Sequence, residues 1–188
     1  MENESVSAGN TLSFGAYSWR KLTVENDRIL LISDNIIEHR SFHDEKTKAG
    51  WGDCSLRQYL NTDFISDTFS AVEQERILTT NVADVDSNKV LAAIRQSEDG
   101  IMNPIIPKVT YTEDRVFLLS VDEVKVLFSE NSDRAAYSNE DASWWWLRSP
   151  GLFTGTIAAV AADGATYSRG YDVDNAAGGV RPALWISI

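Results

Sequence analysis

The sequence predicts a single α+β domain built from short antiparallel strands and a few helices. Strand-like segments come first, short helical segments follow them, and strand-like segments return from residue 143 onward. This order is typical of an α+β domain, whereas regular alternation of strands and helices would indicate a parallel sheet. The chain has 188 residues, of which 43% are hydrophobic, and this composition suits one domain with a sizeable core. We therefore expect one domain over residues 11–188, preceded by a flexible lead-in at residues 1–10.

The N-terminal part changes from strand-like to helical periodicity. The segment LSFGAYSWRKLTV (12–24) is rich in aromatic and β-branched residues and predicts a strand pair or one long bent strand. The apolar run RILLIS (28–33) predicts a buried strand. Residues 55–76 carry apolar side chains at helical spacing, so we expect two or three short helices there. Within them, Ser70 and Glu73 have the spacing of a capping box, which marks a helix start.

The middle of the chain is the least regular part. Residues 77–82 again have strand character, and residues 83–110 predict a long surface excursion with one helix at 88–96. The apolar run at 115–119 predicts a strand that leads into a helix. A second capping box, SVDE at 120–123, marks the start of that helix.

The C-terminal part contains the three consecutive tryptophans and predicts short strands joined by turns. The segments WWWLRS, TIAAVAA, ATYS and GGVRPALWI are separated by Gly, Asp, Ser and Asn. In a strand, Trp144, Trp146 and Arg148 would share one face. Trp145 and Leu147 would share the other face. We expect Trp145 and Trp146 to lie in the core, and Trp144 to stay partly exposed near the polar YSNEDAS segment.

Two arginines follow or lie within apolar strands of this part. Arg148 and Arg181 occur in similar sequence contexts. The planar guanidinium group suits a carboxylate or several loop carbonyl groups. We therefore predict a structural role for both.

The charge balance restricts the class of partner. Asp and Glu number 28 and Lys and Arg number 17, so the net charge is -11 and repels nucleic acid backbones. No apolar run approaches the roughly 20 residues that span a bilayer, which argues against membrane insertion. The N-terminus has no apolar segment typical of a signal peptide, and a cytoplasmic or phage-particle location is favoured.

No pattern of residues predicts catalysis, a metal or a cofactor. His39 and His43, the only histidines, lack the glutamate of a zinc-protease motif. The run that starts at Asp84 resembles a calcium loop, but it has Lys89 and Arg95 where Gly and Glu are required. Cys54, the only cysteine, follows an aspartate that would raise its pKa, so we expect a packed thiol. We therefore expect a protein that is not an enzyme and binds no metal or cofactor.

Several motifs resemble those of an uncharacterised bacterial domain family of unknown function. They are WWLRSPG at 145–151 and GGVRPALWI at 178–186, preceded in order by FGAYSWRKL, RILLIS, WGDCSLRQYLNTDF, FSAVEQERI and DRVFLLSVDEV. The resemblance covers most of the chain and is weakest at 83–110 and 129–142. It implies a C-type-lectin-like fold, and as an analogy of fold it implies ligand binding on an irregular surface made of loops.

This resemblance implies a recognition domain that binds a protein or a glycan through its C-terminal loops. A diversified variable receptor is one form that such a domain takes. Tyr, Ser, Asn and Gly in these loops give the composition of a paratope, although ordinary turns use the same residues. The candidate ligand-binding residues are Trp144, Phe153, Tyr167, Arg169, Tyr171, Asp172, Asp174 and Asn175. Two alternatives stay open: a structural or assembly domain of a phage or surface protein, and an enzyme of unknown reaction.

Overall fold

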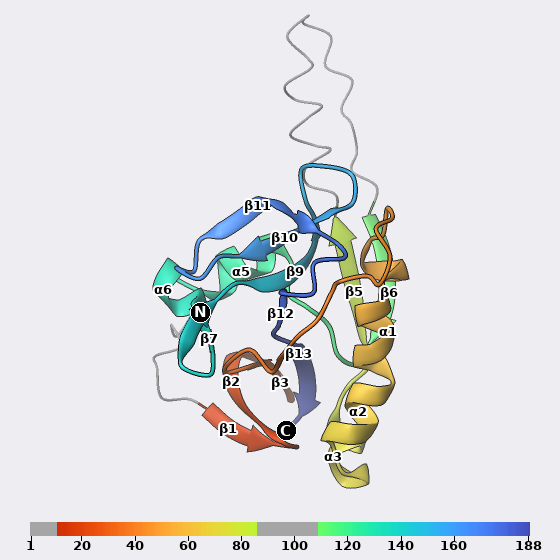
Figure 1. Ribbon diagram of the computed structural model, residues 1–188. Helices are drawn as coiled ribbons and strands as arrows, with labels where there is room; N and C mark the ends of the chain where they lie inside the picture. The colour runs from red at the N-terminus through yellow and green to blue at the C-terminus, as the bar shows by residue number, and fades with distance from the viewer. Residues whose placement is uncertain (1–10, 86–108) are drawn as a thin grey trace, which may run out of the picture.

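The computed structural model describes residues 11–85 and 109–188 and confirms a mixed α+β architecture. Its described strands form two larger sheets and two hairpins, and most neighbouring strands are antiparallel (Figure 1). The predicted lead-in at 1–10 and the predicted helix at 88–96 lie outside the described residues. Every described helix is too short or too polar to cross a membrane.

The four-stranded sheet joins the two ends of the described chain. Its order is β1-β2-β3-β13, with β1 (Thr11–Phe14), β2 (Tyr17–Glu25), β3 (Arg28–Ser33) and β13 (Ala183–Ser187). β13 pairs antiparallel with β3, so the last strand of the chain lies beside one of the first. The predicted strand pair at 12–24 and the predicted buried strand at 28–33 are confirmed.

The five-stranded sheet is built mainly from the C-terminal part. Its order is β11-β10-β9-β12-β4, with β4 (Glu38–His39), β9 (Trp145–Pro150), β10 (Thr156–Val160), β11 (Thr166–Asp172) and β12 (Gly179–Val180). β9 is central and pairs with β10 antiparallel and with β12 parallel. The two hairpins are β5 (Thr80–Val85) with β6 (Val109–Asp114), and β7 (Ala136–Ser138) with β8 (Asp141–Ser143).

Short helices connect these layers. They are the 3-10 helix η1 (Trp51–Asp53) and the α-helices α1 (Ser55–Asn61), α2 (Asp63–Thr68), α3 (Ala71–Arg76), α5 (Val121–Leu127) and α6 (Asn131–Arg134). Residues 55–76 form three short α-helices, in agreement with the prediction of two or three. Both predicted capping boxes are present, at the start of α3 and at the start of α5, with each N-cap serine and its glutamate bonded reciprocally.

The strand predicted at 115–119 is wrong. β6 ends at Asp114, and the following segment makes only an isolated bridge, between Phe117 and Ala183. The backbone N–H groups of Arg115 and Val116 donate to the side-chain oxygen of Asn61, which replaces a strand partner. Residues 116–119 are nevertheless all buried. A segment whose side chains are all buried has the same apolar sequence as a buried strand, so the apolar run alone does not distinguish the two.

The two predicted structural arginines are buried and hold separate elements together. Arg148 makes two bonds with the Glu123 carboxylate, at 2.5 and 2.6 Å, and donates to the carbonyl oxygens of Ala83 and Leu118. This arrangement joins β9 to α5 and β5. Arg181 donates instead to three carbonyl oxygens, those of Ser33, Asp34 and Arg134, at 2.9 to 3.1 Å.

Candidate functional site

The clearest surface cluster is an aromatic patch, which we define as Trp144, Tyr167 and Tyr171. The Trp144 ring stacks on the Tyr171 ring with 4.1 Å between centroids and 29° between planes. The Tyr167 ring follows at 5.0 Å from Tyr171. Trp144 and Tyr171 are half-buried and Tyr167 is exposed. Three neighbouring rings therefore present large, rigid side chains at the surface.

The patch has a rigid base. Trp146 lies fully buried below it, with its ring edge-on to Trp144 at a centroid distance of 4.8 Å. The Trp146 indole Nε1 donates to the carbonyl oxygen of Arg40 at 2.9 Å, and its ring contacts Phe42 at 5.8 Å. A Cβ atom at Gly178 would collide with this indole, so the chain passes closely over it there. The position of Trp144 is thus defined by packing.

The tyrosines of the patch lie on a strand, which corrects one prediction. Arg169, Tyr171 and Asp172 were expected in loops beyond the strand predicted at ATYS (165–168), but together with Tyr167 they belong to β11. Among the described strands, it lies at the edge of the five-stranded sheet and pairs with β10 alone (Figure 1). Its residues are half-buried or exposed, and it therefore lacks the apolar alternation that identifies a strand in sequence.

β11 is also irregular in its middle. The register with β10 shifts between Ile157 and Ala159, and Gly170 has a positive φ of 80°. At this bulge the carbonyl oxygen of Arg169 accepts a hydrogen bond from the Leu152 amide at 3.2 Å. Bulges of this kind disturb the free edge of a sheet and oppose the addition of another strand.

The other candidate residues do not all join the patch. The Arg169 guanidinium lies 5.7 Å from the centre of the exposed Phe153 ring, which makes a separate pair. Asn175 stabilises a turn, because its side-chain oxygen accepts a hydrogen bond from the Ala177 amide at 3.0 Å. Asp172 and Asp174 are exposed at the end of β11 and just beyond it.

One residue of this region, Lys46, was not predicted from the sequence. Lys46 Nζ lies 3.0 Å from the Asp172 carboxylate, although 126 positions separate the two residues. The hydrogen bond with Asp172 and the negative charges of Asp172 and Asp174 raise the pKa of Lys46 above its ordinary value. Lys46 lies in a polar segment, and no local sequence pattern around it predicts this contact.

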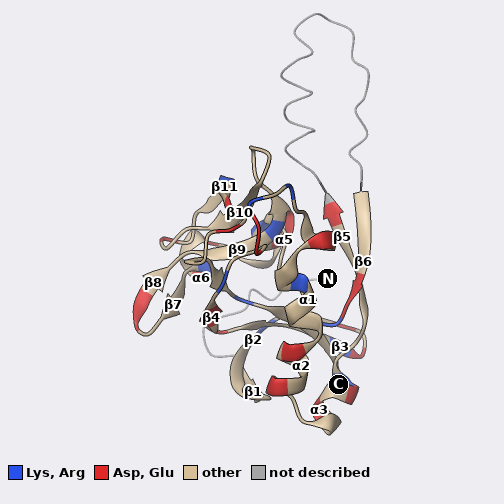
Figure 2. Ribbon diagram, turned by 45° about the vertical axis from the view of Figure 1, so that its right-hand side comes forward, with Lys and Arg blue, Asp and Glu red and all other residues tan. Residues whose placement is uncertain are grey.

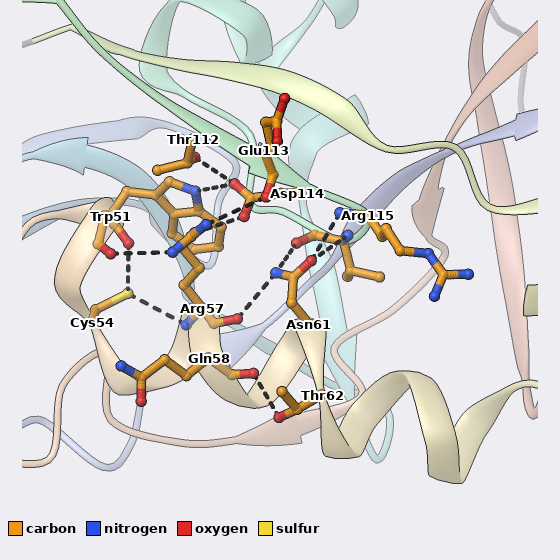
Figure 3. A network of polar contacts seen from close by, with 12 residues as sticks. Trp51, Cys54, Arg57, Gln58, Asn61, Thr62, Thr112, Glu113, Asp114 and Arg115 are labelled. Carbon is orange, nitrogen blue, oxygen red and sulfur yellow. Dashed lines mark hydrogen bonds and ion pairs between the residues drawn. The ribbon is translucent and has the colours of Figure 1, made fainter.

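A second polar cluster lies inside the molecule, around the Asp114 carboxylate (Figure 3). One oxygen accepts from Arg57 Nε at 2.6 Å, and the other accepts from Trp51 Nε1 at 2.8 Å and Thr112 Oγ1 at 2.5 Å. Both carboxylate oxygens are therefore engaged by donors of this chain, and the cluster joins β6 to η1 and α1. Among the described residues, no three His, Cys, Asp or Glu side chains are grouped to hold a metal ion.

Cys54 lies next to this cluster and is fully buried. Its sulfur accepts from the Arg57 amide and donates to the Trp51 carbonyl oxygen, both at 3.4 Å. Burial raises the pKa of the thiol to about 12. The aspartate that precedes Cys54 in the sequence is thus not the main cause of the raised pKa.

We expect the Cys54 thiol to react very slowly in the native protein. At about pH 8, a pKa near 12 leaves roughly a thousandfold less thiolate than an ordinary cysteine has. The measurement is the rate of colour release from Ellman's reagent, with the same protein in guanidinium chloride as the control. Complete labelling of the native protein at the rate of the unfolded protein would contradict the burial of this thiol.

Comparison with models of protein families gives a match. A family model described as a domain of unknown function matches residues 26–188. No curated protein and no solved structure matches the chain. The expected resemblance to an uncharacterised domain family is confirmed.

Proposed function

The chain belongs to the DUF6273 family, and we propose that it is a recognition domain that binds a protein or glycan at the aromatic patch. One observation carries this proposal: a half-buried Trp144 stacks on Tyr171 beside the exposed Tyr167. Tryptophan and tyrosine provide large contact areas at little cost in side-chain entropy, and they dominate many binding surfaces.

We also propose that the arrangement is C-type-lectin-like. Two features support this proposal. The C-terminal strand β13 pairs with the N-terminal strand β3, and a separate sheet from the C-terminal part carries the surface cluster. In this arrangement the ligand surface combines Trp144, which directly precedes β9, with the edge strand β11.

The rigid base below the patch favours binding over a purely local packing role. Trp146 and its hydrogen bond with the Arg40 carbonyl oxygen fix the Trp144 ring before any ligand arrives. A preorganised ring loses little conformational freedom when it binds, so its contact area contributes more fully to affinity.

We expect Trp144→Ala and Tyr171→Ala each to weaken ligand binding by about 1–4 kcal/mol. The ligand is found by screening the full chain against arrays of glycans and peptides, and affinities are then measured by calorimetry. Tyr111→Ala is the matched control, because Tyr111 is an exposed aromatic residue on β6, outside the patch. The proposal fails if no array compound binds, or if every compound that binds retains its affinity for Trp144→Ala.

A further inference from the structure

The strand β6 has a free edge among the described strands. It pairs with β5 alone, and its register stays continuous from Val109 to Asp114. A regular edge offers its backbone groups to another strand, and native proteins commonly interrupt such edges with a bulge, a lysine or a proline. β11 has a bulge, whereas the VTYTED sequence of β6 has none of the three features. Its first residues are uncharged, and its acidic residues lie only at the far end (Figure 2).

The backbone groups of Tyr111 point to this free edge. The carbonyl oxygen of Ala83, the β5 residue opposite Tyr111, accepts a hydrogen bond from Arg148 outside the hairpin at 2.9 Å. The carbonyl oxygen of Glu113 likewise accepts from Arg57 outside the hairpin at 3.4 Å. Backbone groups change side at every residue of an antiparallel strand. The first, third and fifth residues of β6 therefore direct their N–H and C=O groups away from β5.

The open part of the edge is Val109–Tyr111, because Arg57 occupies the carbonyl oxygen of the fifth residue. The side chains of this part are exposed. Val109 and Tyr111 are 36% and 65% exposed on one face of the hairpin, and Thr110 is exposed on the other face. Backbone groups and side chains of three consecutive residues are therefore accessible to another strand.

We propose that β6 pairs antiparallel with β6 of a second copy of this chain, across a two-fold axis that passes through Thr110. In this register Val109 of each copy lies opposite Tyr111 of the other, and the two Thr110 residues lie opposite each other. Each Val109–Tyr111 pair exchanges its outward N–H and C=O groups. The same surface is used by both copies, so the assembly closes as a dimer.

The sequence of this edge is complementary to itself. Aromatic residues opposite β-branched residues, and threonine opposite threonine, are favourable cross-strand pairs. The proposed register contains only pairs of these two kinds. A two-fold axis at Tyr111 would instead need the backbone groups of Glu113, whose carbonyl oxygen is engaged by Arg57. The edge therefore fits a second copy in one register.

The charge of the chain limits the strength of this dimer. Each copy has a net charge of -11, so two copies repel each other and salt reduces the repulsion. The contact between the strands is small, so we expect a weak and reversible dimer that tightens at high salt. Two joined copies carry two aromatic patches, which would bind a ligand with repeated sites together. That consequence rests on the proposed function, whereas the pairing itself does not.

Sedimentation of the full chain over a range of protein and salt concentrations measures the dimer. Tyr111→Pro is expected to weaken association by roughly tenfold or more, because each copy loses an outward N–H donor. The N–H group of Tyr111 is not part of the bonding between β5 and β6, so the hairpin keeps its hydrogen bonds. The melting temperature of the monomer checks that the variant is folded.

Thr110→Cys tests the register directly. Opposite residues of a non-hydrogen-bonded antiparallel pair have Cα atoms about 4.5 Å apart, a separation that suits a disulfide. Under mild oxidation we expect Thr110→Cys to form a covalent dimer at least about tenfold faster than Val126→Cys. Val126→Cys is the matched control, because Val126 is 79% exposed on α5. The native Cys54 is buried and does not compete.

A dimer that Tyr111→Pro dissociates, together with fast linking of Thr110→Cys, supports the inference. It is overturned if the chain stays monomeric at high salt, if Thr110→Cys links no faster than Val126→Cys, or if the dimer survives Tyr111→Pro. A monomer whose Val109 and Tyr111 amide signals shift only with an oligothreonine peptide would show that the edge accepts strands of other proteins, and the second copy would be wrong. Trp144→Ala should dimerise like the wild type, so the outcome for the aromatic patch is separate.

Discussion

Replacing Trp145 with alanine is expected to lower the free energy of unfolding by about 3–5 kcal/mol. The side chain is fully buried in β9, and its indole Nε1 donates to the carbonyl oxygen of Arg134 at 3.0 Å. The buried Arg181 guanidinium lies 5.0 Å from the centre of the ring. Alanine would leave a large cavity and remove the aromatic face beside a buried cation. Urea denaturation followed by circular dichroism measures the change.

The neighbouring tryptophan provides the control for this prediction. Trp144 is half-buried and precedes β9, and its main contacts are the rings of Tyr171 and Trp146. Trp144→Ala should therefore cost only about 0.5–1.5 kcal/mol, the usual contribution of an aromatic pair. Equal losses from Trp144→Ala and Trp145→Ala would show that the two residues are not divided between surface and core.

Local patterns predicted the elements whose structure depends on nearby residues. The capping boxes at Ser70 and Ser120 are defined within four positions of the chain, and both are present. The alternation of side chains in a strand placed Trp145 and Trp146 in the core, and both are fully buried. The mixed α+β class followed from the order of such elements along the chain.

The remaining features depend on contacts between distant segments. The run at 115–119 resembles a strand, but Asn61 satisfies the amides of Arg115 and Val116 because α1 passes beside them. The second half of β11, beyond the strand predicted at ATYS, was expected to be a loop, because an exposed edge strand does not need apolar residues. The Lys46–Asp172 contact joins residues 126 positions apart, and no local pattern specifies it.

The cluster around Asp114 is the clearest case of such a contact. Asp114 is separated from Trp51 by 63 positions and from Arg57 by 57 positions. In sequence it is one of many acidic residues, and nothing distinguishes it from the exposed Glu113 before it. Its fully buried carboxylate accepts hydrogen bonds from Trp51, Arg57 and Thr112. The cost of burying this charge is offset only while these donors are in place.

Asp114→Ala is therefore expected to cost about 3–5 kcal/mol, because it leaves the Arg57 charge without its partner and the Trp51 N–H without an acceptor. Glu113→Ala removes the same charge from the adjacent exposed position of β6 and should change the free energy of unfolding by less than about 0.5 kcal/mol. Urea denaturation of the two variants at the same pH makes the comparison. Similar losses for the two would mean that the negative charge of this strand, and not the buried bonds of Asp114, sets the stability. A large loss for Asp114→Ala alone would establish this carboxylate as the link that holds β6 against η1 and α1.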